Sequence, residues 1–473
     1  MTIKKETKIL TVIIVANMSD HFLLNDIKSL RVSDVLQLLE ESFQKRLYAF
    51  KHVNPSIVLK PLYCRSNIED YSLKDVTNGV AFMSNIMRLE IYWKMSTIQC
   101  VRSAIEKSGE IFNLEDILLK RVIVKVPRSD QASTHFDKIF DNPDEAQSMD
   151  SPEAIDHIEE ALENNTIREI KFYTDFSSNH PELKIPKFYG YKSWDKINKD
   201  GIILMEDLGR NPSFNYYGND VYASIIPMVP GFNDKQVLSI IEELAKIQAA
   251  SANLPMEKKS FVCENFCIEG VTEWIKTMYF MAEAAFVEKM KIEEFADKIK
   301  RSAPIYCRES LENVHYRFRK KNNMHGIFVH NDLWAANILF KKSKTGSFDK
   351  VHGIVDWQTL NLGNPMADIA RLLAFNTTAK YRRENEERLL EYYRTIFNNN
   401  VTDKSKHLSK ENIMTAYKES LPLVLIFFAF STPLYYYMDF INSGTAEEIK
   451  NKREELINRT SAFYDDVLGI LNL

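Results

Sequence analysis

The hydrophobic pattern of this chain changes at Asp207-Leu208-Gly209, and this change limits the folds that the chain can adopt. Short apolar and β-branched runs before this turn predict strands at 81–93, 122–126, 188–191 and 201–205. After the turn the apolar spacing is mainly helical, apart from short strands predicted near 338–340 and 351–355. The sequence therefore predicts an α+β, bilobal fold with an antiparallel β-sheet N-lobe and a mainly helical C-lobe.

We expect three segments along the chain, which are an N-terminal extension at 1–60, an N-lobe at 61–206 and a C-lobe at 207–473. The extension is predicted to contain a helix over Val32–Phe43, where apolar residues recur near helical spacing and Ser33 and Asp34 are available as caps. A further helix is predicted over Glu153–Tyr173 from the same kind of spacing.

The composition is that of a soluble globular protein, with 473 residues, 45% hydrophobic and 27% charged residues, and a net charge of −4. This slightly acidic balance argues against binding to nucleic acid or to an anionic membrane. The five cysteines are odd in number and scattered, which favours reduced thiols and a cytoplasmic location. The uncharged run Leu421–Met438 approaches membrane-spanning length, but its prolines and tyrosines favour one or two buried helices. The sequence does not predict the oligomeric state.

The strongest chemical signal is the segment from His330 to Asn337, in which Asp332 lies two residues after His330. The spacing is His-x-Asp-x-x-x-x-Asn, and a second acid, Asp356, follows an apolar pair further along the chain. A glycine-containing segment then leads to Asp368. Each part alone can arise by chance, but their combination at these distances makes coincidence improbable.

Phosphoryl transfer explains why these residue types are needed, because the protein must orient an attacking hydroxyl and hold Mg²⁺ against phosphates. The carboxylate of Asp332 can accept the proton of the hydroxyl as the new bond forms. Asn337 and Asp356 offer the hard oxygen ligands that Mg²⁺ prefers. ATP and Mg²⁺ are therefore the expected cofactors, and a small molecule with a hydroxyl group is the expected partner.

Three other interpretations remain open. A metal hydrolase using His330, Asp332 and Asp356 would need further histidines in ligand patterns, and His325 and His352 do not form one. A catalytically silent, nucleotide-binding relative is free to lose such residues, so their presence speaks against it. A protein kinase needs room for a peptide-docking segment after Asp356, and the sequence leaves little.

The motifs His330-Asn-Asp-Leu-Trp, Val355-Asp-Trp-Gln358 and Gly363…Asp368-Ile-Ala resemble those of the CHK-kinase-like group, which includes ecdysteroid kinases and nematode kinase-like proteins. This group belongs with choline kinases and aminoglycoside phosphotransferases in the protein-kinase-like superfamily. The resemblance runs from about residue 75 to the C-terminus, and Asp-Trp-Gln is its most specific part. It implies an ATP-dependent phosphotransferase with an alcohol group as acceptor.

The resemblance implies nucleotide-binding roles for residues in the first half of the chain. Lys125, within a strand, would point into the cleft and meet the α- and β-phosphates, although such a lysine usually extends to water. Glu169 would be its partner on the next helix, and the alternatives are a solvated charge there or Glu163 in its place.

The segment Glu206-Asp207-Leu208 resembles the hinge whose backbone binds adenine, and the alternative is an acidic turn. Gly79 and Ser84 align with the loop over the phosphates, which here has fewer glycines than the family pattern.

Two residues of the motifs are expected to support the others. His330 would hold the catalytic loop by a side-chain hydrogen bond, and Asp368 would accept backbone N–H groups of that loop. Asn331 stands where glycine is commoner, and asparagine tolerates a left-handed backbone.

Aromatic and methionine residues in the predicted C-lobe suggest an acceptor with an apolar body, such as a steroid or a glycosylated xenobiotic. These residues are Trp274, Met278, Tyr279, Phe280, Met281, Phe427, Phe428, Phe430 and Tyr435 to Tyr437. For most of them a place in the core is the preferred interpretation, and a choline- or ethanolamine-type kinase remains the alternative.

Overall fold

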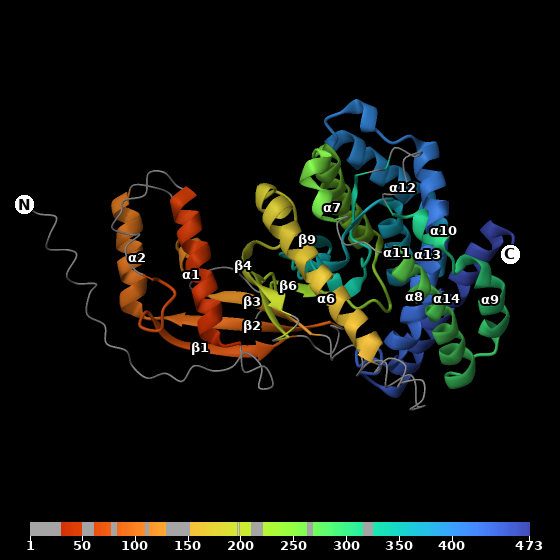
Figure 1. Cartoon of the computed structure of the whole chain (residues 1–473), viewed down its shortest axis with the longest axis horizontal. Helices are drawn as coiled ribbons and strands as arrows, with labels where there is room; N and C mark the ends of the chain where they lie inside the picture. Colours follow the sequence, from red (N-terminus) through yellow and green to blue (C-terminus); the bar gives the residue numbers. More distant parts are fainter. Residues whose placement is uncertain are drawn as a thin grey trace, which may run out of the picture. The chain divides into compact units, whose positions relative to one another are not determined.

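The computed structural model describes residues 30–49, 61–76, 83–108, 113–128, 152–195, 197, 199–209, 221–262, 268–315, 324 and 326–473. The chain divides into two compact units. Unit 1 comprises Met1–Arg128 and Pro186–Val221, and unit 2 comprises Ser129–Ile185 and Tyr222–Leu473. The two units are described separately below (Figure 1).

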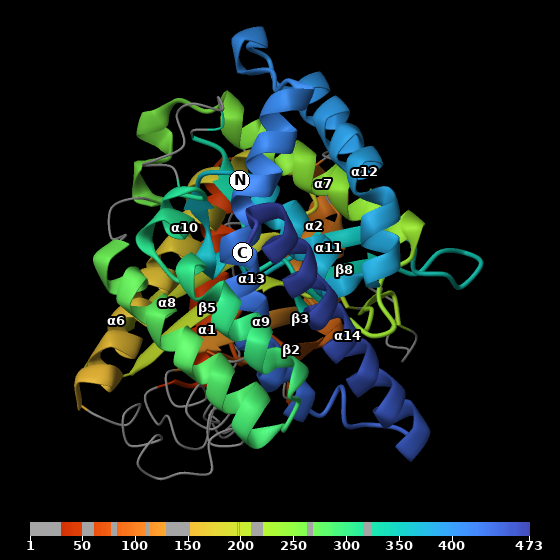
Figure 2. The ribbon, with the colours of Figure 1, turned by 90° about the vertical axis from the view of Figure 1, so that its right-hand side faces the viewer.

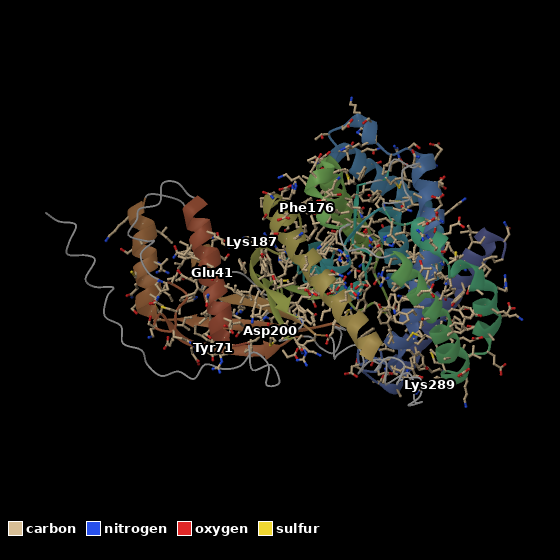
Figure 3. The ribbon with its side chains drawn as sticks, viewed as in Figure 1. Glu41, Tyr71, Phe176, Lys187, Asp200 and Lys289 are labelled. Atoms are coloured by element: carbon tan, nitrogen blue, oxygen red, sulfur yellow. The ribbon has the colours of Figure 1, made fainter. Side chains whose placement is uncertain are left out.

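Unit 1 contains a five-stranded antiparallel sheet in the order β1-β2-β3-β5-β4. Its strands are β1 (Ile68–Asp75), β2 (Ser84–Trp93), β3 (Arg121–Pro127), β4 (Phe188–Asp195) and β5 (Asp200–Glu206). The predicted antiparallel sheet is thus confirmed in these described residues. Asp200, labelled in Figure 3, binds Lys192 on the neighbouring strand at 2.7 Å. Val122, Val124 and Val126 of β3 and Ile202 and Leu204 of β5 belong to the apolar core of unit 1.

Helices α1 (Val32–Ala49) and α2 (Met95–Ser108) pack with the sheet into one apolar core. The predicted helix over Val32–Phe43 is confirmed and extends by one and a half turns to Ala49. Helix α2 was not predicted, because only Ile98, Val101 and Ile105 among its residues join that core. A short helix, α3 (Leu114–Ile117), leads into β3.

Unit 2 is mainly helical, as predicted for the second half of the chain. Its α-helices in the described residues are α6 (Pro152–Lys171), α7 (Asp234–Asn253), α8 (Ile268–Glu283), α9 (Glu294–Ser302), α10 (Arg308–Glu312), α11 (Met366–Asn376), α12 (Ala379–Asn400), α13 (Lys410–Tyr437) and α14 (Ala446–Leu471). All residues of helix α11 are buried, and the helix packs against α12, α13 and α14, which Figure 2 draws in blue. Asn233 and Thr445 begin α7 and α14 with capping boxes, so local sequence defines both helix starts.

Two small antiparallel sheets in unit 2 carry the motif residues. Strands β6 (Ala223–Ile225), β8 (Ile338–Lys341) and β9 (Lys350–Ile354) form one sheet, and β7 (Phe328–Val329) pairs with β10 (Asn361–Leu362) in the other. The strands predicted near 338–340 and 351–355 are therefore confirmed. Between them, these sheets hold both ends of the segment from 330 to 337.

The uncharged run Leu421–Met438 lies almost wholly within the single helix α13. Among the described residues, α13 is the one helix long and apolar enough to cross a membrane by length and composition. In this structure 67% of its most apolar window is buried inside the protein. The run thus forms a buried helix, as the sequence predicted, with Pro422 and Pro433 inside it.

The two compact units have different boundaries from the three segments expected from the sequence. The segment Ser129–Ile185, which includes α6, groups with the helical unit, although the predicted N-lobe at 61–206 contained it. Helix α6 contacts the turn that follows Asp356, and the ring of Phe172 stacks on that of Trp357 at 4.3 Å. The division into 1–60, 61–206 and 207–473 remains a prediction about function.

Candidate active site

The candidate catalytic loop, residues 330–337, connects β7 to β8 and ends in a short 3-10 turn at Ala335–Asn337. The amide nitrogen of buried Asn337 donates to the backbone carbonyl of Asp332 at 2.8 Å and to its Oδ2 at 3.1 Å. The side chain of Asp332 is 26% exposed, so it remains accessible to a reactant. The loop therefore presents a fixed carboxylate whose orientation is set by the asparagine five residues later.

Asp356 comes two residues after β9 and next to the strand that Asn337 precedes. Ile338 pairs with Ile354, and the amide of Val355 donates to the carbonyl of Asn337 at 3.0 Å. Asp356 adopts a left-handed backbone with φ of 64°, a conformation that aspartate tolerates better than most residues. The sheet thus places the two expected Mg²⁺ ligands on adjoining segments.

The donor set fits a Mg²⁺ ion carried by a nucleotide. Since Nδ2 of Asn337 is engaged by Asp332, the opposite end of the planar amide offers its oxygen. Magnesium is usually held by one or two protein oxygens together with phosphates and waters. Among the described residues no group of three or more His, Cys, Asp and Glu side chains is arranged to hold a metal, so a hydrolase-type cluster is not found there.

His330 is buried, and both of its ring nitrogens bind backbone groups. Nδ1 accepts a hydrogen bond from the amide of Asp332 at 3.2 Å, and Nε2 lies 2.9 Å from the carbonyl of Val355, to which it donates. This pattern assigns the proton to Nε2. With both nitrogens occupied, the ring connects the candidate catalytic loop to the segment before Asp356, which supports a positioning role.

Asp368, in the first turn of α11, is fully buried beneath the loop. Its carboxylate accepts hydrogen bonds from the backbone amides of His330 at 2.8 Å and Asn331 at 2.9 Å. Burial raises the pKa of Asp368, while these amides and His330 act in the opposite direction. Asn331 has φ of 62°, as its residue type suggested. The expected contact between this acid and the loop backbone is present.

Two residues that the sequence analysis missed complete this buried network. Gln248 on α7 donates to Asp368 at 2.9 Å, and its own oxygen accepts from the hydroxyl of Tyr393 on α12 at 2.7 Å. Burial and the charge of Asp368 raise the pKa of Tyr393. No local sequence pattern predicts the contact between Gln248 and Asp368, because Gln248 precedes Asp368 by 120 residues.

Arg371 is a third residue without a predicted role, although it lies within the quoted motif one turn after Asp368. Its Nη2 binds Oδ1 of Asp332 at 2.6 Å, and only 8% of its side chain is exposed. Both carboxylate oxygens of Asp332 are therefore engaged, one by Asn337 and one by Arg371.

Glu169 lies on α6 and is only 1% exposed, so the alternative of a solvated helix charge is wrong, and Glu163 is more exposed. Tyr173, one turn later, is also fully buried. Burial and the negative charges of Glu169 and Asp356 raise the pKa of Tyr173. Phe176, labelled in Figure 3, closes the π-helical turn that carries this tyrosine.

Unit 1 holds the other predicted nucleotide-binding residues. Lys125 lies on β3 between Ile86 and Ile203 and is only 3% exposed, so it does not extend to water. Ser84 begins β2 and is buried. Gly79 lies outside the described residues.

The predicted hinge follows the end of β5 in unit 1. Glu206 is the last residue of β5, and Leu208 is buried. Asp207 binds Arg88 through two hydrogen bonds of 2.6 and 3.2 Å and accepts from the amide of Gly209. The side chain of Asp207 thus stabilises this turn. Binding of adenine by backbone groups of the segment remains a prediction.

Of the eleven aromatic and methionine residues, three are buried, two are exposed and six are partly buried. Met278, Phe428 and Tyr435 are the buried ones, so the core position preferred for most of the group holds in full for these three. Trp274 is 43% and Phe280 66% exposed, so these two side chains on α8 reach the surface. The ring of Trp274 lies 6.2 Å from that of Phe427 on α13.

A sheet unit and a helical unit that carries a His-x-Asp loop, its asparagine and a following aspartate define a protein-kinase-like protein, as predicted. The chain belongs to the DUF1679 family, whose model is described as "Uncharacterized oxidoreductase dhs-27" and matches residues 67–472. The expected kinship with nematode kinase-like proteins is confirmed.

Two relatives come from Caenorhabditis elegans. The uncharacterized kinase-like protein D1044.1 is 27% identical over 361 residues, which are 74% of this chain and 85% of that protein. The uncharacterized oxidoreductase dhs-27 is 24% identical over 310 residues, which are 64% of this chain and 34% of that protein. The shared part is thus about a third of the oxidoreductase, and its name describes the whole protein.

Three solved structures are similar to this chain at low identity. Choline kinase from Cryptosporidium parvum has a TM-score of 0.43 and 10% identity, covering 93% of this chain and 98% of that one. Ethanolamine kinase from Plasmodium vivax has a TM-score of 0.38 and 12% identity, covering 83% and 82%. A putative aminoglycoside phosphotransferase from Ralstonia eutropha has a TM-score of 0.37 and 10% identity, covering 85% and 96%.

Proposed function

We propose that this protein is an ATP- and Mg²⁺-dependent kinase that phosphorylates a hydroxyl group of a small molecule. The observation that carries the proposal is the arrangement around Asp332. Its carboxylate is partly exposed, is oriented by Asn337, and belongs to a loop that His330 ties to the segment before Asp356. Membership in a family with a kinase-like relative supports the same conclusion.

In the proposed reaction the hydroxyl oxygen of the acceptor attacks the γ-phosphorus of ATP. A bond forms between this oxygen and phosphorus, the bond to the bridging oxygen breaks, and ADP leaves. Asp332 accepts the hydroxyl proton, which requires its carboxylate to remain ionised and within hydrogen-bond reach of the acceptor. Mg²⁺, when bound, neutralises phosphate charge, and Asn337 and Asp356 would hold it.

The remaining roles follow the resemblance to the superfamily and are proposed residue by residue. Lys125 would bind the α- and β-phosphates and Glu169 would support it, and the burial of both side chains argues for specific partners. Ser84 and Gly79 would contact the phosphates, and backbone groups of 206–208 would bind the adenine.

The acceptor is proposed to carry an apolar body next to its hydroxyl, as a steroid or a glycosylated xenobiotic does. Support comes from the aromatic side chains that lead away from Asp332. Arg371, bound to Asp332, lies 5.9 Å from the ring of Phe427, whose ring in turn lies beside the exposed Trp274. A cytoplasmic location is proposed on the free thiols of Cys64, Cys100 and Cys307 among the described residues.

The test is phosphoryl transfer from ATP to a panel of steroids, glucosides and choline by the wild type and by Asp332→Asn. The amide keeps the shape of the carboxylate but cannot take the proton, so kcat is expected to fall by about 10² to 10⁴-fold. Nucleotide binding, measured by calorimetry, is expected to persist, which separates loss of chemistry from loss of fold.

Asp297→Asn is the matched control, since Asp297 is an exposed acid on α9 that pairs weakly with Arg301. It is expected to retain wild-type kcat. A wild type that binds ATP without transferring phosphate to any hydroxyl compound would favour the catalytically silent alternative. Turnover of choline alone would favour the choline-type alternative and reject the apolar acceptor.

A further inference from the structure

Arg371 places a buried cation directly against the candidate base. The guanidinium contacts Asp332 at 2.6 Å and lies 4.3 Å from the centre of the Phe375 ring, so its position is held by an ion pair and by an aromatic face. Its Nε is buried and has no hydrogen-bond partner in the described part of the chain. The ion pair thus brings a nearly buried positive charge beside a partly exposed carboxylate.

The positive charge of Arg371 changes which acceptors the carboxylate of Asp332 can attract. An isolated Asp332 would attract a cationic group attached to the reacting hydroxyl, whereas the pair of Asp332 and Arg371 carries no net charge. A cationic acceptor whose hydroxyl reaches Asp332 must also bring its positive charge close to the guanidinium. Repulsion by the guanidinium therefore offsets the attraction by the carboxylate, while a neutral acceptor is unaffected.

Several aromatic rings of α11 and α13 already lie against positively charged side chains of the protein. Arg453 lies over the ring of Tyr436 at 4.6 Å, and Lys289 lies over that of Tyr437 at 5.9 Å. Arg371 covers Phe375 and approaches Phe427. A quaternary ammonium group binds by the same attraction to ring faces, so at these rings it would compete with the side chains that already cover them.

The tryptophan in the candidate catalytic loop does not supply a free face either. Trp334 is stacked on Tyr435 with ring centres 4.8 Å apart, and both rings are buried. Phe440 contacts both of them, with ring centres 6.2 and 6.0 Å away. Each of the three rings therefore has the other two as neighbours.

We propose that Arg371 is a specificity-determining residue that selects uncharged hydroxyl compounds and rejects cationic ones. The inference rests on the proposed kinase function and adds the charge class of the acceptor and the residue that sets it. Arg371 acts in two ways, because it fixes the Oδ1 side of Asp332 and cancels the attraction of that carboxylate for a cation.

The experiment compares choline with neohexyl alcohol, its neutral isostere, in which carbon replaces the quaternary nitrogen. Because the two molecules share size and shape, the ratio of their kcat/KM values reports charge alone. We expect the wild type to favour the neutral alcohol by at least about tenfold. If both are poor substrates, their inhibition constants against the best neutral acceptor of the panel give the same ratio.

Two variants at position 371 separate charge from shape. Arg371→Gln removes the positive charge and is expected to shift the ratio toward choline by at least about tenfold, whatever happens to overall activity. Arg371→Lys keeps the charge but loses the planar fork, so it is expected to preserve the preference for the neutral alcohol. Thermal unfolding and ATP binding verify that each variant is folded.

Arg382→Gln is the matched control. Arg382 is a buried arginine of unit 2 that binds Asp466 at 2.6 Å and lies 5.0 Å from the ring of Phe463, so its surroundings resemble those of Arg371 away from the site. Its substitution is expected to lower stability without changing the ratio.

The outcomes distinguish this inference from the function on which it rests. Transfer to hydroxyl compounds with a wild-type preference for choline, or with a ratio unchanged in Arg371→Gln, would overturn the role of Arg371 and leave the kinase function intact. Absence of transfer to every acceptor would overturn both.

Discussion

The backbone amide of Asp332 donates a hydrogen bond of 3.2 Å to Nδ1 of His330, while Nε2 of the same ring bonds to the carbonyl of Val355. One imidazole therefore joins the loop that carries the candidate base to the residue preceding the candidate metal ligand, Asp356. Because the ring is buried and both of its nitrogens are occupied, the distance between base and ligand is built into the fold of unit 2.

The metal role of Asp356 predicts a specific change in the dependence on Mg²⁺. In Asp356→Asn a neutral amide replaces the carboxylate, and asparagine tolerates the same left-handed backbone, so the turn is preserved. The Mg²⁺ concentration for half-maximal phosphoryl transfer is expected to rise by at least about tenfold. A Mg²⁺ titration at fixed ATP measures it, and an unchanged midpoint would remove Asp356 from the metal site.

The carboxylate of Asp368 predicts a large stability effect. Two backbone amides and Gln248 donate to its oxygens, and asparagine at this position would turn an N–H group toward one of those donors. Asp368→Asn is expected to lower the free energy of unfolding by roughly 2–4 kcal/mol, measured by urea denaturation. Asp234→Asn, at a half-exposed acid of α7, is expected to cost less than about 1 kcal/mol. Equal losses in the two variants would contradict the network.

The motif has glycine at position 363 because a larger side chain would not fit there, and not because the backbone is left-handed. A Cβ built there would lie 1.9 Å from the carbonyl oxygen of Val314, which is itself fixed by the amide of Asn364. Gly363→Ala is therefore expected to destabilise the protein by several kcal/mol, on the order of 3 or more, in thermal or urea unfolding. Gly469→Ala is the control, because nothing lies within 4 Å of its Cβ on α14 and alanine favours the helix. That variant is expected to be neutral or slightly more stable.

His315 predicts a loss of stability in mild acid. Burial lowers its pKa from 6.5 to about 3, and Asn361 donates to its Nδ1. Between these two values the unfolded chain binds a proton that the folded protein does not. The stability that this group provides is therefore present above pH 6.5 and is lost as pH falls toward 3.

The corresponding slope is about 1.4 kcal/mol per pH unit from this one group. Urea denaturation at several pH values, in the wild type and in His315→Gln, measures it. In the variant, the pH dependence of the unfolding free energy is expected to lack the contribution of this one proton. Parallel curves for the two proteins would show that His315 titrates normally when folded.

The elements next to the site were predictable because their signals are local. Ile338–Phe340 and the run before Asp356 alternate or cluster as strands do, and the spacing from His330 to Asn337 is fixed within one loop. The burial of Glu169 was not predictable, since its helical spacing is compatible with either a solvated or a buried position. Helix α2 was missed for the related reason that few of its residues join the core.

By itself, the sequence determined the α+β class, the strand–loop–strand that carries Asp332, Asn337 and Asp356, and the family to which they belong. Only the tertiary structure decided which side chains surround that carboxylate. Arg371 reaches Asp332 across 39 residues, and Gln248 reaches Asp368 across 120. Such contacts follow from how α7 and α11 pack beneath the loop, and helix packing depends on complementary surfaces that no local spacing encodes.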